Sequence, residues 1–184
     1  MKILFYSLNA ALWLHALPEN RLVRELVAAG HQVTYVTCGS CFPQHCTSMS
    51  ASGIELGDAQ EKKDAVCASC NQNAGILARS NRADHLELRD FVTDKDHEAC
   101  RELADALSAE TYLDFQFMGI DVGRLASYEL FLKYKKMSPE LAPEQWDYCK
   151  LYIKNCLISL LGFSRLFQAK KPDVVFFYSP QYGI

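Results

Sequence analysis

The sequence predicts an α/β protein with a Rossmann-like, doubly wound sheet that is mainly parallel and has helices on both faces. Residues 18–38 read as an amphipathic helix, a Gly-His turn and a buried strand. An apolar stretch precedes this unit at residues 3–7, and the continuous apolar run DVVFFYS at residues 173–179 is typical of a strand buried on both faces. Strands separated by helices favour parallel pairing, because parallel neighbours need a crossover connection.

The first part of the chain supplies two strands and the helix between them. We assign Ile3 to Ser7 to the first core strand. Gly30 provides the left-handed residue that ends the helix, and a β-branched and aromatic run follows up to Cys38. The apolar residues of the helix recur at helical spacing and are Leu22, Val23, Leu26 and Val27.

Residues 39–84 differ in character, with several glycines and many Ser, Asn, Asp and Gln side chains. We predict a long cysteine-rich loop, an insertion at about residues 38–84, with a short helix around Asp64 to Arg79 as its only regular element. A loop of this length in a compact domain is usually functional or needs a cross-link to order it.

The rest of the chain alternates between strand and helix signals. His85 to Val92 alternates in polarity as a strand does. Thr93 with Asp96 forms an acidic variant of the capping box and opens a helix to about Ser108. The remaining predicted elements are helices at Val122 to Lys136 and Pro143 to Lys170 and a strand at Asp173 to Ser179.

Composition limits the class of protein. At 184 residues with 49% hydrophobic content, the chain can bury one core, so we expect a single domain over residues 1–184. A net charge of -3 offers no basic footprint for nucleic acid. Eight cysteines without a recognisable secretory signal favour a reducing compartment, the cytoplasm.

The last predicted strand ends close to Ile184. A complete doubly wound domain usually continues from such a strand into a helix. We therefore expect the chain to be the N-terminal half of a larger protein.

Five of the cysteines gather within residues 38–70 and suggest a metal site. Cys38/Cys41 and Cys67/Cys70 are two Cys-x-x-Cys pairs, and such pairs chelate one ion from two tight turns. Zinc and an iron-sulfur cluster both use four thiolates, so the metal stays open. Free or disulfide-prone thiols are the alternative interpretation.

Several motifs together resemble the N-terminal domain of GT-B glycosyltransferases. In that domain a first strand leads to a His-x-x-Pro helix start, then to Gly-His and a second strand, and here His15, Pro18, Gly30 and His31 precede VTYVT. The cysteine series and the segments FMGIDVGRLASYELFLKY and KPDVVFFYS are similar to a bacterial branch that makes capsular and other surface polysaccharides. The resemblance covers nearly the whole chain and favours Cys38, Cys46, Cys67 and Cys70 as the metal ligands, with Cys41 as a spare thiol.

The resemblance implies the acceptor-binding half of a glycosyltransferase, whose partner would be a glycan or a lipid-linked acceptor. The domain that holds the nucleotide-sugar donor in this family has no counterpart here, so we expect no complete transfer by this chain alone. The alternative function is a non-catalytic binding or scaffold module stabilised by a metal.

His15 is the candidate catalytic base. Inverting transfer needs a base that takes the proton of the acceptor hydroxyl, and imidazole has a suitable pKa. The matching position supplies that base in plant-type and antibiotic-type GT-B enzymes, although Leu14 here replaces the usual Gly. Asp121 is one candidate to orient the imidazole. A structural histidine near the start of the first helix is the alternative.

Candidate acceptor contacts follow the strands that end at the predicted cleft. Asn9 follows the first strand, where it could bind an acceptor hydroxyl or cap a helix over Ala10 to Leu14. His45 lies in the cysteine-rich loop, and Ser179 and Gln181 follow the last strand. The basic residues near the end of the predicted helix 122–136 suggest peripheral contact with a membrane surface or a lipid-linked acceptor and are Lys133, Lys135 and Lys136.

Overall fold

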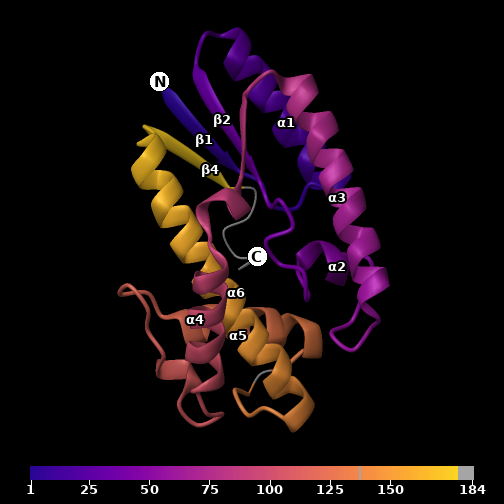
Figure 1. The fold of residues 1–184 in the computed structure, drawn as a ribbon, viewed down its shortest axis with the longest axis vertical. Helices are drawn as coiled ribbons and strands as arrows, with labels where there is room; N and C mark the ends of the chain where they lie inside the picture. The colour runs from indigo at the N-terminus through magenta and orange to yellow at the C-terminus, as the bar shows by residue number, and fades with distance from the viewer. Residues whose placement is uncertain (137, 178–184) are drawn as a thin grey trace. The chain divides into compact units, whose positions relative to one another are not determined.

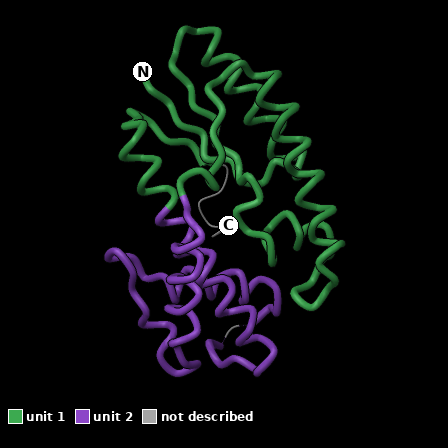
Figure 2. The backbone as a smooth tube through the Cα atoms, viewed as in Figure 1, with its two compact units in different colours: residues 1–91, 162–179 green, residues 92–161, 180–184 purple. Residues whose placement is uncertain are grey.

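The computed structural model describes residues 1–136 and 138–177, which divide into two compact units (Figure 2). Unit 1 contains residues 1–91 and the described residues from 162 onward, and unit 2 contains the described residues between 92 and 161. Helix α6 (Pro143–Lys170) contributes its first part to unit 2 and its last part to unit 1. The strands of the described chain, whose course Figure 1 shows, all belong to unit 1.

The sheet of unit 1 is parallel throughout, as predicted. Its strands are β1 (Lys2–Tyr6), β2 (Gln32–Thr37), β3 (Asp84–Glu87) and β4 (Val174–Phe177), in the order β3-β2-β1-β4. The chain builds outward from β1 through β2 to β3 and then returns to the other side of β1. This reversal is a topological switch point, where open α/β sheets bind ligands at the carboxyl ends of their strands.

Helices cover both faces of the sheet, which confirms a Rossmann-like α/β architecture. Because successive strand side chains alternate, Ile3 and Phe5 face α1 (Trp13–Ala28) and α3 (Gln60–Asn81) in one apolar core. Leu4 and Val36 face the other side, where Leu166 of α6 joins them.

Two helix boundaries differ from the sequence prediction. Helix α1 begins at Trp13 and contains Pro18, whereas Pro18 was expected at its start. The predicted loop at 38–84 is instead largely helical, because α2 (Thr47–Ala51) and the 22-residue α3 lie within it. The inner side of α3 is a narrow stripe of mostly small residues, Cys70, Ala74 and Leu77, which is a weak apolar signal among many polar residues.

The strand predictions at 85–92 and 173–179 need correction as well. Strand β3 ends at Glu87 and continues as a 3₁₀ turn over Leu88–Phe91. Strand β4 lies at an edge of the sheet, and Phe176 and Phe177 are exposed. The prediction that this strand is buried on both faces was therefore wrong for the described residues of β4. An apolar run does not reveal whether a strand is central or at an edge of the sheet.

Unit 2 contains the predicted helices at nearly their predicted bounds. Helix α4 (Asp94–Asp105) begins with the predicted capping box of Thr93 and Asp96, in which each residue bonds the other's backbone. Helix α5 spans Val122–Tyr134, and its Gly123 meets the backbone of a 3₁₀ turn (Tyr112–Asp114). A Cβ at Gly123 would lie 1.6 Å from the Tyr112 carbonyl oxygen, so only glycine fits there.

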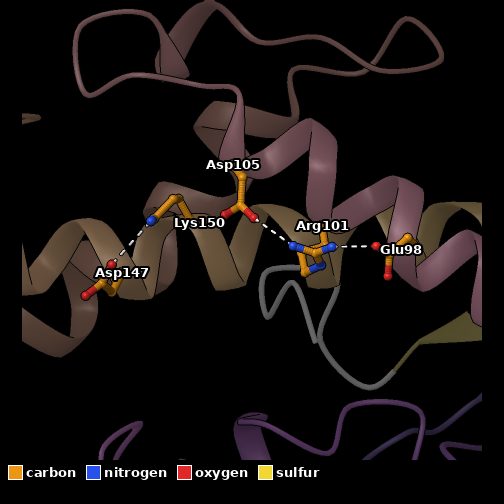
Figure 3. A network of polar contacts seen from close by, with 5 residues as sticks. All are labelled: Glu98, Arg101, Asp105, Asp147 and Lys150. Carbon is orange, nitrogen blue, oxygen red and sulfur yellow. Dashed lines mark hydrogen bonds and ion pairs between the residues drawn. The ribbon is translucent and has the colours of Figure 1, made fainter.

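Figure 3 shows the ion pairs of α4 and the first part of α6. Arg101 pairs with Glu98 at 2.5 Å and with Asp105 at 3.5 Å, and Lys150 pairs with Asp147 at 3.3 Å. In each pair, the two residues lie three or four positions apart on the same helix, and most of these side chains are exposed. Such pairs stabilise a helix by roughly 0.3–0.5 kcal/mol each, so we assign them no further role.

In the part of the chain that the structure describes, no helix combines the length and the apolar character needed to cross a membrane.

Candidate functional site

The candidate site of unit 1 lies at the carboxyl edge of its sheet. The segment after β1 reaches α1 through residues 7–12, and the segment after β2 carries Cys38, Cys41 and Cys46 before α2. The N-terminal half of α3 brings Cys67 and Cys70 to the same place. We call the five cysteines at positions 38, 41, 46, 67 and 70 the thiol cluster.

A buried polar network lies just beyond the end of β1. The Tyr35 hydroxyl donates a hydrogen bond to Ser7 Oγ at 3.0 Å, and Ser7 Oγ donates to a carboxylate oxygen of Glu19 on α1. All three side chains are buried. Burial raises the pKa of Glu19 above its usual 4.5, and the hydrogen bond from Ser7 opposes that shift.

The first thiol of the cluster sits in a tight turn. Gly39 and Ser40 both have left-handed backbones, with φ of 62° and 61°, and the Cys41 N–H donates to Cys38 Sγ at 3.3 Å. A Cβ at Gly39 would lie 2.5 Å from a Glu87 carboxylate oxygen. Strand β3 therefore packs directly on this turn, and both the left-handed backbone and the contact require glycine.

The remaining thiols are held by backbone and hydroxyl groups. Cys46 is the N-cap of α2 and makes no side-chain capping hydrogen bond, although the nearby backbone N–H groups of Ser48 and Met49 favour its thiolate and so oppose the rise of its pKa. Cys67 interacts with the Ser40 hydroxyl, so α3 touches the turn that follows β2. Cys70 interacts with the Ser48 hydroxyl and with the backbone of residues 10 and 11, which links it to the segment after β1.

Electrostatic interactions connect the thiols with one another. Cys38 interacts with Cys41 and Cys46, and Cys46 interacts with both Cys67 and Cys70. Burial raises the pKa of every one of them, to about 11 for Cys46 and about 12 for Cys41. Without a bound cation, the cluster is therefore protonated near neutral pH.

The donor chemistry of the cluster fits a thiophilic ion such as zinc, whereas the present side-chain positions do not yet form a coordination shell. Within residues 1–136 and 138–177, no three His, Cys, Asp or Glu side chains are grouped closely enough to hold a metal. The electrostatic interactions link Cys38 through Cys46 to Cys67 and Cys70, whereas those of Cys41 are with Cys38 and Arg89. Both candidate quartets stay predictions.

His15 lies in the first turn of α1, where it is half-buried and its N–H donates to the Leu12 carbonyl. It thus stands on a helix that begins at the carboxyl edge of the sheet. Asp121 belongs to unit 2, where its carboxylate accepts a hydrogen bond from Gln116 at 2.7 Å.

The predicted acceptor contacts have different surroundings. Asn9 is half-buried, and its side-chain oxygen accepts a hydrogen bond from Ser48 at 3.4 Å. The N-cap of α1 is Leu12, so the alternative of a helix over residues 10–14 capped by Asn9 was wrong. His45 is fully buried, and its Nε2 bonds the Ile54 carbonyl oxygen at 3.0 Å. Ser179 and Gln181 lie outside the described residues.

Sequence reasoning missed the network of Ser7, Glu19 and Tyr35. One signal was present, because Glu19 stands four residues before Val23 and therefore on the buried side of α1. An acidic residue on the apolar face of a helix indicates a polar partner in the core.

We compared the chain with protein-family models, with curated proteins and with solved structures, and none of them matched.

Proposed function

We propose that this chain is the acceptor-binding half of a glycosyltransferase. It would hold a glycan or lipid-linked acceptor while a sugar is moved from a nucleotide-sugar donor, as in surface polysaccharide synthesis. The observation that carries the proposal is the position of His15, in the first turn of the helix that follows β1 at the switch point of a parallel sheet.

The proposed reaction needs one proton acceptor in the acceptor-binding half of the enzyme. His15 takes the proton of the acceptor hydroxyl as that oxygen forms a bond to the anomeric carbon of the sugar. The bond between the anomeric carbon and the nucleotide diphosphate breaks, and the diphosphate leaves with its electron pair. A second domain would hold the donor, so the chain by itself binds the acceptor and completes no transfer.

The thiol cluster has a structural role in this proposal. Cys38, Cys46, Cys67 and Cys70 would hold zinc or an iron-sulfur cluster, and four protein thiolates leave no open position for a substrate. The metal would supply positive charge to thiols whose pKa burial has raised. It would also join the segment after β2 to α3, and so order the residues that surround the acceptor site.

Acceptor binding can be tested with a panel of bacterial surface oligosaccharides immobilised on a glycan array. We expect saturable binding to a subset of the panel, and Asn9→Ala should weaken it about tenfold, which corresponds to the loss of one hydrogen bond to a ligand. Gln72→Ala is the matched control, because Gln72 is an exposed amide on α3. Absence of binding to every oligosaccharide by folded protein would contradict the proposal.

A metal-stabilised binding module without catalytic function is the second candidate, and the convergence of five thiols at one edge of the sheet favours it. Elemental analysis and an absorption spectrum of anaerobically purified protein decide whether zinc or iron is present. The two variants Cys41→Ser and Cys46→Ser are a matched pair. Loss of the metal only in Cys46→Ser supports the proposed quartet, and loss only in Cys41→Ser supports the two Cys-x-x-Cys pairs. Absence of metal from the wild-type protein overturns both metal-ligand quartets.

A further inference from the structure

Helix α5 of unit 2 is apolar on two opposite sides. Its inner side is buried and includes Val122, Ala126 and Leu130. Leu125, Tyr128 and Leu132 follow one another at helical spacing on the outer side, and they are 47%, 36% and 48% exposed. A helix at the surface of a protein normally turns charged or polar residues outward, so this second, partly exposed apolar stripe departs from the usual pattern.

The turn that precedes α5 adds to this exposed apolar surface. Phe117 and Ile120 pair across a tight turn, which holds Met118 in a left-handed backbone with 59% of its surface exposed. Ile120 is exposed as well. Of the six exposed large hydrophobic residues that unit 2 shows among its described residues, five belong to this short segment. The five form what we call the α5 stripe and are Met118, Ile120, Leu125, Tyr128 and Leu132.

The charges around the α5 stripe are mostly positive. Between residues 118 and 136, which include the whole stripe, the acidic residues are Asp121 and Glu129 and the basic residues number four, in a chain whose net charge is -3. Arg124 and Lys135 are exposed, and Lys136 donates to the Glu140 carbonyl and to the Gln145 side-chain oxygen, which are both uncharged. The basic residues of this segment are Arg124, Lys133, Lys135 and Lys136.

We propose that the α5 stripe and its basic residues dock on the surface of an anionic lipid bilayer. Leucine and methionine side chains would enter the boundary between headgroups and acyl chains, and Tyr128 suits the headgroup level because its ring is apolar and its hydroxyl is polar. The exposed Arg124 and Lys135 would interact with anionic headgroups, whereas Lys133 lies over the Tyr148 ring, 4.7 Å from its centroid. The local excess of one charge sign favours this occupant over a second copy of the chain, which would bring the same positive charge to the interface.

The proposal does not depend on the glycosyltransferase function, because it concerns a different surface. A chain that bound no oligosaccharide could still bind vesicles, and the reverse also holds. The two proposals can therefore fail separately.

Co-sedimentation with vesicles tests the docking surface. We expect the full chain to sediment with vesicles of equal parts phosphatidylcholine and phosphatidylglycerol, to stay in solution with phosphatidylcholine alone, and to be released by high salt. The double variant Leu125→Ser with Leu132→Ser should lose at least tenfold in affinity. Lys135→Glu, which reverses one charge, should lose roughly fivefold or more.

Matched controls separate this surface from general effects. Leu103→Ser removes a 41% exposed leucine from α4 of the same unit, and Lys95→Glu reverses an exposed charge at the start of that helix. Both should sediment like the wild-type protein. The proposal is overturned if the wild-type chain does not sediment, or if the controls lose as much affinity as the stripe variants. It is equally overturned if the stripe variants only abolish self-association, measured by sedimentation velocity without lipid.

Discussion

Glu19 shows how one buried side chain couples a helix to the end of a strand. It lies on the inner side of α1 and accepts a hydrogen bond from Ser7, which in turn accepts one from Tyr35. Burial of an ionised carboxyl costs free energy unless hydrogen bonds compensate it, and here the raised pKa of Glu19 indicates that the compensation is incomplete.

This raised pKa predicts how stability depends on pH. The folded state binds the Glu19 proton more tightly than the unfolded state, whose pKa is near 4.5. The contribution of Glu19 to stability is therefore fully present below pH 4.5 and is lost as the pH rises through the folded-state pKa. We expect Glu19→Gln to remove this loss, so its free energy of unfolding in urea should fall less between acid and neutral pH.

Glu25→Gln is the control for that experiment, because Glu25 is an exposed residue on the same helix. It should leave the pH dependence of the free energy of unfolding unchanged. If the free energy of unfolding depended on pH in the same way for Glu19→Gln and the wild-type protein, burial would not raise the pKa of the Glu19 carboxyl.

Thiol reactivity gives a second prediction at the scale of single residues. Without metal, a pKa of about 11 leaves Cys46 almost entirely protonated at pH 8, and only the thiolate reacts with iodoacetamide. Its alkylation rate should therefore rise about tenfold for each pH unit between 7 and 9, with no plateau near the usual thiol pKa of about 8.5. Peptide mass spectrometry after a timed reaction measures the rate, and urea-unfolded protein should show the ordinary plateau.

Helix α5 depends on one glycine because of a close backbone approach. The Gly123 N–H donates to the Phe115 carbonyl at 3.1 Å, and the Tyr112 carbonyl occupies the space of a Cβ. Gly123→Ala should lower the free energy of unfolding by roughly 3 kcal/mol, at the upper end of overpacking effects. The change can be measured by urea unfolding followed by circular dichroism.

Gly75→Ala is the matched control, because Gly75 also lies within a helix but a Cβ there meets only the mobile end of Arg79 at 3.3 Å. It should leave stability unchanged or raise it by up to about 1 kcal/mol, since alanine favours the helix. Equal destabilisation by both substitutions would argue against a specific contact at Gly123.

The start of α4 gives a prediction about helix capping. Thr93 accepts a hydrogen bond from the Asp96 N–H at 3.2 Å, and the Asp96 carboxylate accepts one from the Thr93 N–H at 2.7 Å. Thr93→Ala should cost about 1 kcal/mol of stability, whereas Thr93→Ser keeps the cap and should cost little. Urea unfolding of the two variants compares them, and a neutral Thr93→Ala would show that the capping box contributes nothing.

At the scale of the whole molecule, four parallel strands and the helices on both faces of their sheet form unit 1, and helices form unit 2. Strands β1 and β2 and helices α4, α5 and α6 follow from the sequence because their apolar periodicity and their caps are local. Helix α3 was predicted only as a short helix around Asp64 to Arg79, and its full extent, Gln60–Asn81, was missed. Its inner stripe consists mostly of small residues, which give little contrast in hydrophobicity.

Local pattern was sufficient for the parallel α/β class, for the Gly30 turn and for the presence of a cysteine series after β2, since each depends on neighbouring residues alone. The strand order decided that β4 is an edge strand. Only the tertiary structure brought Cys46 into electrostatic interaction with Cys67 and Cys70, joined Glu19 to Ser7 and left a second apolar side of α5 exposed. These features depend on which distant segments pack together, and such packing is a property of the folded chain that residue spacing does not encode.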